Sequence, residues 1–301
     1  MKPPVRDDGL LLVDKPVGPT SHDVVARVRR ALGTRRVGHT GTLDPFASGL
    51  LLVCVNRATR LVEYLHGFAK EYVAVAELGR VTDTLDPEGE VTATHDGWQS
   101  LDSGAIRTGL DELGGRPTQL PPVFSAKKVA GEAAHRRIRR GEEVRLEPVP
   151  VTIHALELLR WTPPLLEFRA VVSTGTYIRA MARDLGEILG VGAHLRRLRR
   201  TGIGPFQVTE AVALDALDAL DGPTPRAGTW LSALDAVGHL PQLQLTATEV
   251  QAILAGRSLP SPGDAPFSTG AAVALSTEGR LLAVAEARGD SLQPRKVFPL
   301  E

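Results

Sequence analysis

Cysteine is almost absent from this sequence, because Cys54 is the only one among 301 residues. A single cysteine cannot form an internal disulfide and cannot build a cysteine-based zinc site. This composition is typical of a reducing compartment, so we expect a cytoplasmic protein. Cys54 itself lies in the apolar stretch LLLVCV, which favours a buried core residue over a reactive thiol.

Long apolar runs are also missing. The first residues, MKPPVRDDGLLLVDKP, contain a short apolar run that Asp14 ends, and this run is too short for the hydrophobic region of a signal peptide. No stretch approaches the roughly 18 apolar residues that a membrane-spanning helix needs. We therefore expect no association with a membrane.

Neither sign of charge is in excess, since Lys plus Arg and Asp plus Glu both total 35. Overall charge therefore gives no indication of a polyanionic partner, and any indication must come from local clusters. Signature motifs of several enzyme classes are absent too: there is no G-x-x-x-x-G-K-[ST], no H-E-x-x-H and no G-x-S-x-G. The eight histidines show no paired ligand spacing, so we expect chemistry by ordinary side chains without a metal.

What is present is a mixture of helical and strand patterns. Apolar residues at helical spacing predict helices over residues 20–33, 58–67, 103–115 and 176–190. Alternating or short continuous apolar runs predict strands over residues 9–16, 70–79, 90–94, 151–161 and 165–173. Because strands and helices do not alternate regularly, the sequence predicts an α+β fold with a mixed, largely antiparallel central sheet flanked by helices.

The last part of the chain has a different character. Residues 221–240 are rich in proline and glycine and are typical of a linker. A helix over residues 245–260 and a hairpin over residues 271–287, turned by Glu278 and Gly279, are predicted after it. We therefore expect a large domain over residues 1–238 and a small β-rich domain over residues 239–301.

Asp44 is the most unusual charge in the sequence, because it lies between a glycine-rich turn and an aliphatic run in GHTGTLDPFASGLLLV. Pro45 restricts Asp44 to extended backbone geometry. Asp44 could cap a short helix that follows. It could instead be a reactive carboxylate, held in place by a stiff loop.

A second segment, STGTYIRAMARDLG, brings Tyr177 and Arg179 to the start of a predicted helix. Tyr177 could be a core residue and Arg179 a solvated charge. If Arg179 contacts Asp44, however, the opposite charge favours the ionised acid and orients it.

Two clusters of basic residues supply the local charge that the overall balance lacks. Residues 127–145 are dense in Lys and Arg, and HLRRLRR over residues 194–200 holds four arginines without an acid. Either cluster alone is typical of a solvated helix face. Together they favour a surface for a phosphate backbone.

With these residues in place, the chain resembles the bacterial tRNA pseudouridine synthases of family B. The resemblance covers about residues 8–210 and rests on motifs that occur in one order: LLVDKPVGPTSHDVV, VGHTGTLDPFASGLL, KEYVAVAELGRVTDTLDPEGEV, QLPPVFSAKKVAGE, STGTYIRAMARDLG and GAHLRRLRRTGIGPF. It implies the pseudouridine synthase fold and isomerisation of the T-loop uridine at position 55 of tRNA to pseudouridine. It also implies base flipping and no cofactor or metal.

The resemblance assigns roles to single residues. Asp44 corresponds to the catalytic aspartate, Tyr72 to the tyrosine that stacks on the target base, and Arg179 to the arginine that pairs with the aspartate. The remaining residues of the implied substrate site are His39, which would fill the space of the flipped nucleotide, Tyr177 and Leu198 in the pocket wall, and Lys127, Lys128, Arg136 and Arg140 in an RNA-gripping insertion over about residues 125–147. The C-terminal part is similar to a small RNA-binding domain of the PUA type.

The sequence departs from the family pattern at Phe124, where tyrosine is common, and at His135 and Arg137, where aromatic residues are frequent. Two other functions remain possible at this stage: a tRNA-binding chaperone without catalysis, or a nucleoside hydrolase with an aspartate nucleophile. We expect tRNA as the partner, no obligate protein partner, and a monomer.

Overall fold

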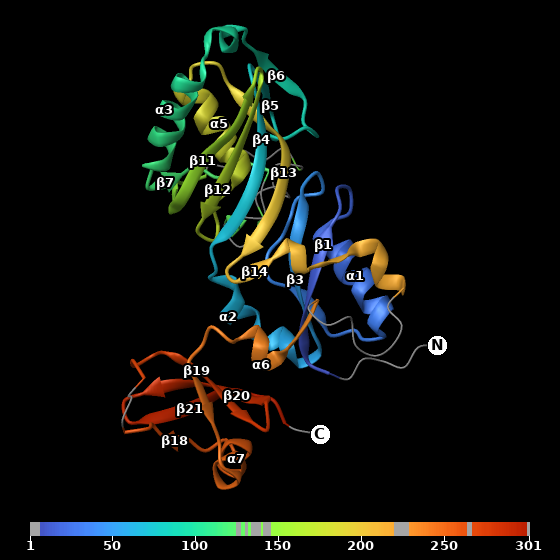
Figure 1. The fold of residues 1–301 in the computed structure, drawn as a ribbon, viewed down its shortest axis with the longest axis vertical. Helices are drawn as coiled ribbons and strands as arrows, with labels where there is room; N and C mark the ends of the chain where they lie inside the picture. Colours follow the sequence, from blue (N-terminus) through green and yellow to red (C-terminus); the bar gives the residue numbers. More distant parts are fainter. Residues whose placement is uncertain are drawn as a thin grey trace.

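The computed structural model describes residues 7–124, 128–129, 132–133, 140, 146–219, 229–263 and 267–299. Two sheets organise this part of the chain, a large one and a five-stranded one close to the C-terminus. The C-terminal sheet, drawn in red, lies at one end of an elongated molecule (Figure 1).

The large sheet is built from β1 (Gly9–Lys15), β2 (Val37–His39), β3 (Ser48–Val55), β4 (Lys70–Leu78), β11 (Ile153–Thr162), β12 (Leu165–Val172), β13 (Ala193–Ile203), β14 (Phe206–Gln207), β15 (Val212–Ala213) and β16 (Trp230–Ser232). Its main order is β11-β12-β4-β13-β3-β1-β15, while β2, β14 and β16 pair with β3, β13 and β1. All pairs are antiparallel except β13 with β3 and β1 with β15. The predicted α+β class with a mixed, largely antiparallel sheet is confirmed.

The described residues also form three separate two-stranded sheets. They join β5 (Arg80–Thr82) to β6 (Val91–Thr94), β7 (Thr118–Gln119) to β10 (Val149–Pro150), and β8 (Lys128–Val129) to β9 (Glu132–Ala133).

The predicted helices lie against this sheet. They are α1 (Ser21–Leu32), the short α2 (Val62–His66) after a 3-10 turn η1 (Asn56–Leu61), α3 (Ser103–Gly114) and α5 (Ile178–Ile188). Thr20 caps α1 by accepting from the Asp23 amide, and Gly33 ends it in the left-handed conformation with φ of 65°. The apolar faces of α3 and α5 share one core with the inner faces of β4, β12 and β13. Within the described ranges, no helix has the length and apolar character needed to cross a membrane.

Strand β13 joins the two halves of the large sheet. It pairs antiparallel with β4 over most of its length and meets β3 in parallel at Arg199 and Arg200. Gly49 in β3 has φ of 107°, and a side chain there would collide with the backbone of Arg200. Only glycine permits this close approach. The approach places the turn that precedes β3 directly beside β4 and β13.

The prediction of a linker over residues 221–240 is wrong for its described part. Residues 220–228 lie outside the described residues, but Trp230 and Leu231 in β16 pair with Leu11 and Leu10 of β1. Ser232 then caps the short helix α6 (Ala233–Ala236). The proline and glycine content of this segment does not reveal such a long-range pairing, which is why the sequence alone misleads here.

The C-terminal sheet has the order β17-β19-β20-β21-β18 and carries one helix. Its elements are β17 (Gln242–Gln244), α7 (Ala247–Leu254), β18 (Leu259–Pro260), β19 (Ala272–Thr277), β20 (Arg280–Arg288) and β21 (Ser291–Val297). The predicted helix and hairpin are confirmed, and both turn residues, Glu278 and Gly279, have positive φ. Leu281 and Phe298 share an apolar cluster with Leu10 and Leu61, so the small sheet packs firmly on the large one.

Candidate active site

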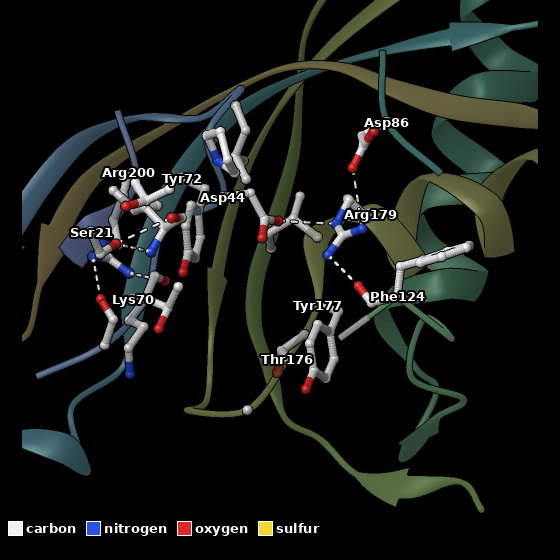
Figure 2. A pocket seen from close by; sticks show the side chains of 18 of the residues that line it. Ser21, Asp44, Lys70, Tyr72, Asp86, Phe124, Thr176, Tyr177, Arg179 and Arg200 are labelled. Carbon is white, nitrogen blue, oxygen red and sulfur yellow. Dashed lines mark hydrogen bonds and ion pairs between the residues drawn. The ribbon is translucent and has the colours of Figure 1, made fainter. Parts of the chain in front are cut away.

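A pocket of about 780 Å³ opens where the two halves of the large sheet meet (Figure 2). One wall is the turn over residues 41–45, before β3, and another is the segment 174–179 that leads into α5. Side chains of the sheet and of nearby loops complete the lining, among them Lys70, Tyr72, Thr84, Asp86, Glu88, Phe124, Leu198 and Arg200. The pocket therefore collects residues from segments that are far apart in the sequence.

Asp44 lies in a tight turn between β2 and β3. Its carbonyl oxygen accepts a hydrogen bond from the Ala47 amide at 3.1 Å, and β3 begins at the next residue. The interpretation of Asp44 as a helix cap is therefore wrong, because the chain passes from the turn directly into a strand. Ser21 holds the turn from the side of α1, since its hydroxyl donates to the Leu43 carbonyl at 3.1 Å and accepts from the Leu43 amide at 2.9 Å.

Lys15 supports the same turn from the protein interior. Its side chain is fully buried, and Nζ donates to the carbonyl oxygens of Pro16 at 2.9 Å, Pro19 at 2.8 Å and Pro45 at 3.4 Å. Burial lowers the pKa of Lys15 to about 8, although the nearby Asp44 carboxylate works in the opposite direction. Asp44 is thus held by a rigid turn, as its position before Pro45 suggests.

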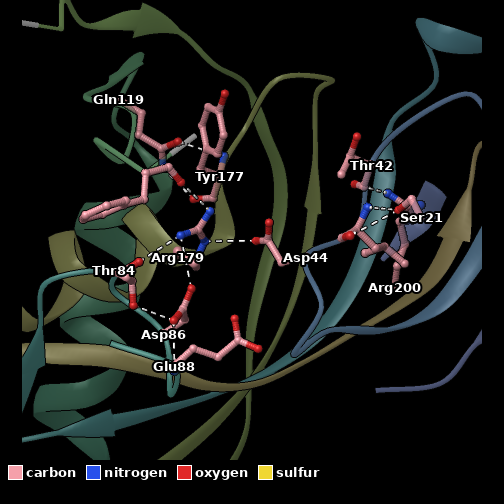
Figure 3. A network of polar contacts seen from close by, with 12 residues as sticks. Ser21, Thr42, Asp44, Thr84, Asp86, Glu88, Gln119, Tyr177, Arg179 and Arg200 are labelled. Carbon is pink, nitrogen blue, oxygen red and sulfur yellow. Dashed lines mark hydrogen bonds and ion pairs between the residues drawn. The ribbon is translucent and has the colours of Figure 1, made fainter. Parts of the chain in front are cut away.

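The structure brings Asp44 and Arg179 together, with Arg179 Nε 3.0 Å from Asp44 Oδ2 (Figure 3). The other guanidinium nitrogens are occupied as well. Nη1 donates to the Thr84 carbonyl at 2.8 Å and lies 3.2 Å from Asp86 Oδ2, and Nη2 donates to the Phe124 carbonyl at 3.0 Å. Arg179 is therefore fixed from several sides, and the carboxylate that it orients faces the pocket.

Exposure distinguishes the two carboxylates that flank Arg179. Both line the pocket, but the Asp86 side chain is 7% exposed, whereas the Asp44 side chain is 37% exposed. The surrounding walls still remove water from Asp44, and this burial raises its pKa. The Arg179 guanidinium lowers the pKa, as expected from the sequence, but burial outweighs it, and the charge of Asp86 adds to the rise.

The expected stacking residue Tyr72 and the expected pocket-wall residues Tyr177 and Leu198 all line the cavity. Tyr72 projects from β4 and is 6% exposed. Gln119 fixes the backbone of Tyr177, accepting from its amide at 2.9 Å and donating to its carbonyl at 3.1 Å. Phe124 contributes its carbonyl oxygen to Arg179, so the replacement of a family tyrosine by phenylalanine leaves that backbone contact unchanged.

His39 lies behind the pocket wall rather than in it. Its ring packs edge to face on His22, with 5.5 Å between the ring centroids, and His22 lines the pocket. Burial lowers the pKa of His39, which favours the neutral ring. Its Nδ1 atom is buried without a hydrogen-bond partner among the described residues. The role that the resemblance implies for His39 stays a prediction.

The basic clusters divide into described and undescribed parts. Lys127 and Arg136 lie outside the described residues, and so do the side chain of Lys128 and the departures at His135 and Arg137; Arg140 is described and exposed. The second cluster is strand β13 and not a helix, and its Arg200 is 1% exposed, so Arg200 lies in the pocket wall and not on an open surface. Arg196 and Arg199 are bonded to Glu77 and Asp14, at 2.6 Å and 2.7 Å.

Several pocket residues are not singled out by the sequence, above all Asp86 and Lys70. Asp86 had a visible signal, because the tetrapeptide TLDP that contains Asp44 recurs at residues 84–87. From the sequence alone, this second tetrapeptide is typical of an ordinary turn. Lys70 has no such signal, and the basic cluster over residues 194–200 does not indicate that Arg200 lies beside Lys70. Only the meeting of β4, β13 and the 41–45 turn places the two together.

Comparison with known proteins supports what the geometry indicates. The family model of the TruB family pseudouridylate synthase N-terminal domain matches residues 29–178, and that of the tRNA pseudouridylate synthase B C-terminal domain matches residues 179–227. The chain is 44% identical to a tRNA pseudouridine synthase B of Thermobifida fusca, over 97% of this chain and 98% of the relative. It is 46% identical to a namesake of Cutibacterium acnes, over 83% and 85%.

Solved structures agree with these matches. One chain in an H/ACA ribonucleoprotein bound to a substrate RNA that contains 2′-deoxyuridine has a TM-score of 0.72 and 27% identity, covering 97% of this chain and 85% of that one. A chain in the archaeal Nop10–Cbf5 complex has a TM-score of 0.69 and 29% identity, covering 97% and 86%. The chain described here belongs to the TruB family of pseudouridylate synthases.

Proposed function

We propose that this protein converts a uridine of tRNA to pseudouridine and that Asp44 acts on the ribose of that uridine. The observation that carries the proposal is the ion pair between Asp44 and Arg179 at the wall of a pocket of about 780 Å³. Pockets that enclose small ligands typically measure roughly 300–1,000 Å³. One nucleotide can therefore enter with its sugar next to the carboxylate.

The reaction needs a group that can act near C1′ of the ribose. Pseudouridine forms when the bond from C1′ to N1 breaks, the uracil turns, and its C5 bonds to C1′ while the proton on C5 is lost and N1 gains one. Ionised Asp44 can attack C1′ as a nucleophile, or remove the C2′ proton as a base to give a glycal. Both routes need the unprotonated, oriented carboxylate that Arg179 supports, and neither consumes an oxidant or an energy source.

A uridine inside folded RNA has to leave its stack to reach Asp44, which costs a few kcal/mol. Stacking of the freed base on an aromatic side chain is worth about 1–3 kcal/mol and offsets this cost. Tyr72 and Tyr177 line the pocket and can supply such contacts, with Leu198 as an apolar wall. We assign Tyr72 as the stacking residue, Tyr177 and Leu198 as pocket walls, and Arg179 as the residue that orients the acid.

The finer parts of the proposal follow from the resemblance. The target is the uridine at position 55 in the T-loop. RNA is held by the insertion over about residues 125–147, including Lys127, Lys128, Arg136 and Arg140, and by the C-terminal domain over residues 239–301. His39 occupies the space that the flipped nucleotide leaves. The protein acts as a monomer in the cytoplasm, without an obligate protein partner.

Product analysis tests the proposal. The full-length protein is incubated with an unmodified tRNA transcript, and the RNA is digested and mapped for modified nucleosides. The proposal expects one pseudouridine in intact RNA, in the T-loop. Free uracil with an abasic site would mean a nucleoside hydrolase, and tightly bound but unaltered RNA would mean a chaperone; either result overturns the proposal.

A further inference from the structure

Lys70 is a buried cation in the pocket that the proposed reaction does not use. It is the first residue of β4, two residues before Tyr72, so both side chains lie on the same face of the strand. Lys70 lines the pocket and is 8% exposed. It lies on the same side of Asp44 as Arg200 and across the pocket from Arg179 (Figure 2).

Among the described residues, no carboxylate pairs with Lys70. Its Nζ atom donates a hydrogen bond to the Phe68 carbonyl oxygen at 3.1 Å. Glu71, its neighbour in the chain, projects from the other face of β4 and is bonded to Arg169 at 2.6 Å and Thr201 at 2.9 Å. The nearest acid in the sequence is therefore already engaged elsewhere.

Arg200 adds a second positive charge beside Lys70. Its guanidinium is satisfied by neutral acceptors, the carbonyl oxygens of Leu50 at 2.7 Å, Gly41 at 3.1 Å and Thr42 at 3.4 Å. These bonds hold the guanidinium in place but leave its charge uncompensated. Burial and the repulsion from Arg200 lower the pKa of Lys70 to about 8. This end of the pocket is thus a fixed, electropositive wall.

A buried cation without a counter-ion is unfavourable in the free protein and becomes favourable when an anion arrives. The uracil and ribose of the proposed substrate are neutral, so the anion has to come from the backbone of the RNA. The Asp44 carboxylate repels phosphate from its own side of the pocket. We infer that Lys70, with Arg200 behind it, binds a phosphodiester adjacent to the target uridine and thereby sets the depth at which the nucleotide enters.

This inference rests on the proposed function but is tested by binding instead of turnover. Synthetic tRNAs carry one neutral methylphosphonate linkage, either 5′ or 3′ of the target uridine, and equilibrium affinities are measured for the wild type and Lys70→Met. A hydrogen bond to a charged group justifies an expected loss of about tenfold or more for the wild type at one of the two linkages. Lys70→Met should bind ordinary tRNA about tenfold or more weaker than the wild type does. The neutral linkage should then lower the affinity of this variant little further.

Two further variants separate a binding role from a structural one. Arg116→Met also removes one positive charge, at a residue that is paired with Glu112 at 3.3 Å outside the pocket, and it should respond to the neutral linkage like the wild type. Lys70→Arg should retain most of the affinity and most of the sensitivity to the linkage. The logarithm of the binding constant falls linearly with the logarithm of the salt concentration. Lys70→Met should make this slope less steep by about 0.7, the value for one contact to a single strand.

The inference is overturned if the losses from Lys70→Met and from the neutral linkage multiply at both positions. It is also overturned if Lys70→Met is folded by circular dichroism and binds like the wild type. A failure of the proposed function looks different, because the wild type would then form no pseudouridine on ordinary tRNA while these binding measurements could still be made.

Discussion

Replacement of Asp86 by asparagine tests whether the shared arginine controls the acid in the pocket. Asp86 Oδ1 accepts from the Thr84 hydroxyl at 2.5 Å and from the Glu88 amide at 3.1 Å, while Oδ2 faces Arg179 at 3.2 Å. The asparagine oxygen can keep the first two bonds. The amide nitrogen that replaces Oδ2 then opposes the Arg179 guanidinium, donor against donor, so the perturbation falls on that one contact.

The expected loss of stability in Asp86→Asn follows from the burial of the ion pair. Removal of one partner from a buried ion pair costs about 3–5 kcal/mol when the other charge is left alone. Arg179 is 7% exposed but keeps Asp44 and two carbonyl oxygens, so we expect a smaller loss, about 1–3 kcal/mol in the free energy of unfolding. In a thermal melt this is a fall of about 2–4 °C for each kcal/mol. Asp215→Asn, at the 85% exposed partner of Arg27, is the matched control and should cost no more than about 1 kcal/mol.

The same variant should change the pH dependence of activity. Asp86 raises the pKa of Asp44, so its neutralisation should lower that pKa. Because the proposed reaction needs ionised Asp44, the acidic limb of kcat/KM should move to lower pH in Asp86→Asn and stay in place in Asp215→Asn. A folded Asp86→Asn protein with an unmoved acidic limb, or one that moves to higher pH, would refute the reasoning.

Three further outcomes are expected. Tyr72→Ala should lower kcat/KM by about 5- to 150-fold, the equivalent of 1–3 kcal/mol of stacking. Tyr72→Phe should retain stacking, so an equal loss of kcat/KM in both variants would contradict the assignment. Gly49→Ala should lower the melting temperature markedly, because φ is 107° and the added methyl group meets the Arg200 backbone; an unchanged melt would show that the two strands can separate without cost. Burial raises the pKa of the Cys54 thiol to about 12, so the native protein should resist alkylation at pH 8, and rapid labelling without denaturant would contradict a buried thiol.

Local patterns predict local structure well in this chain. Thr20 and Gly33 bracket α1 in the sequence and in the structure, because a capping side chain and a left-handed glycine act within one turn of the helix. Alternating apolar residues likewise predict β4. The linker prediction fails at Trp230 for the opposite reason, since its partner strand β1 lies more than two hundred residues earlier.

The candidate site likewise contains residues that local sequence selects and residues that only long-range packing brings together. Asp44 and Arg179 can be selected from the sequence, because each lies in a turn of unusual composition and the family resemblance links them. Asp86, the second carboxylate on Arg179, could not be assigned, since its role depends on how the loop before β6 folds onto α5. Lys70 and Arg200 become a pair only when β13 crosses from β4 to β3. Contacts of this kind depend on tertiary packing, which periodicity and spacing do not encode.

The central claim is that ionised Asp44, oriented by Arg179, acts on the ribose of a flipped uridine. Release of tritium from tRNA that carries 5-tritiated uridine, measured in a single turnover with Asp44→Asn in excess, tests this claim most directly. The account predicts that the variant binds tRNA with the affinity of the wild type and releases no tritium. Release at the wild-type rate would contradict it.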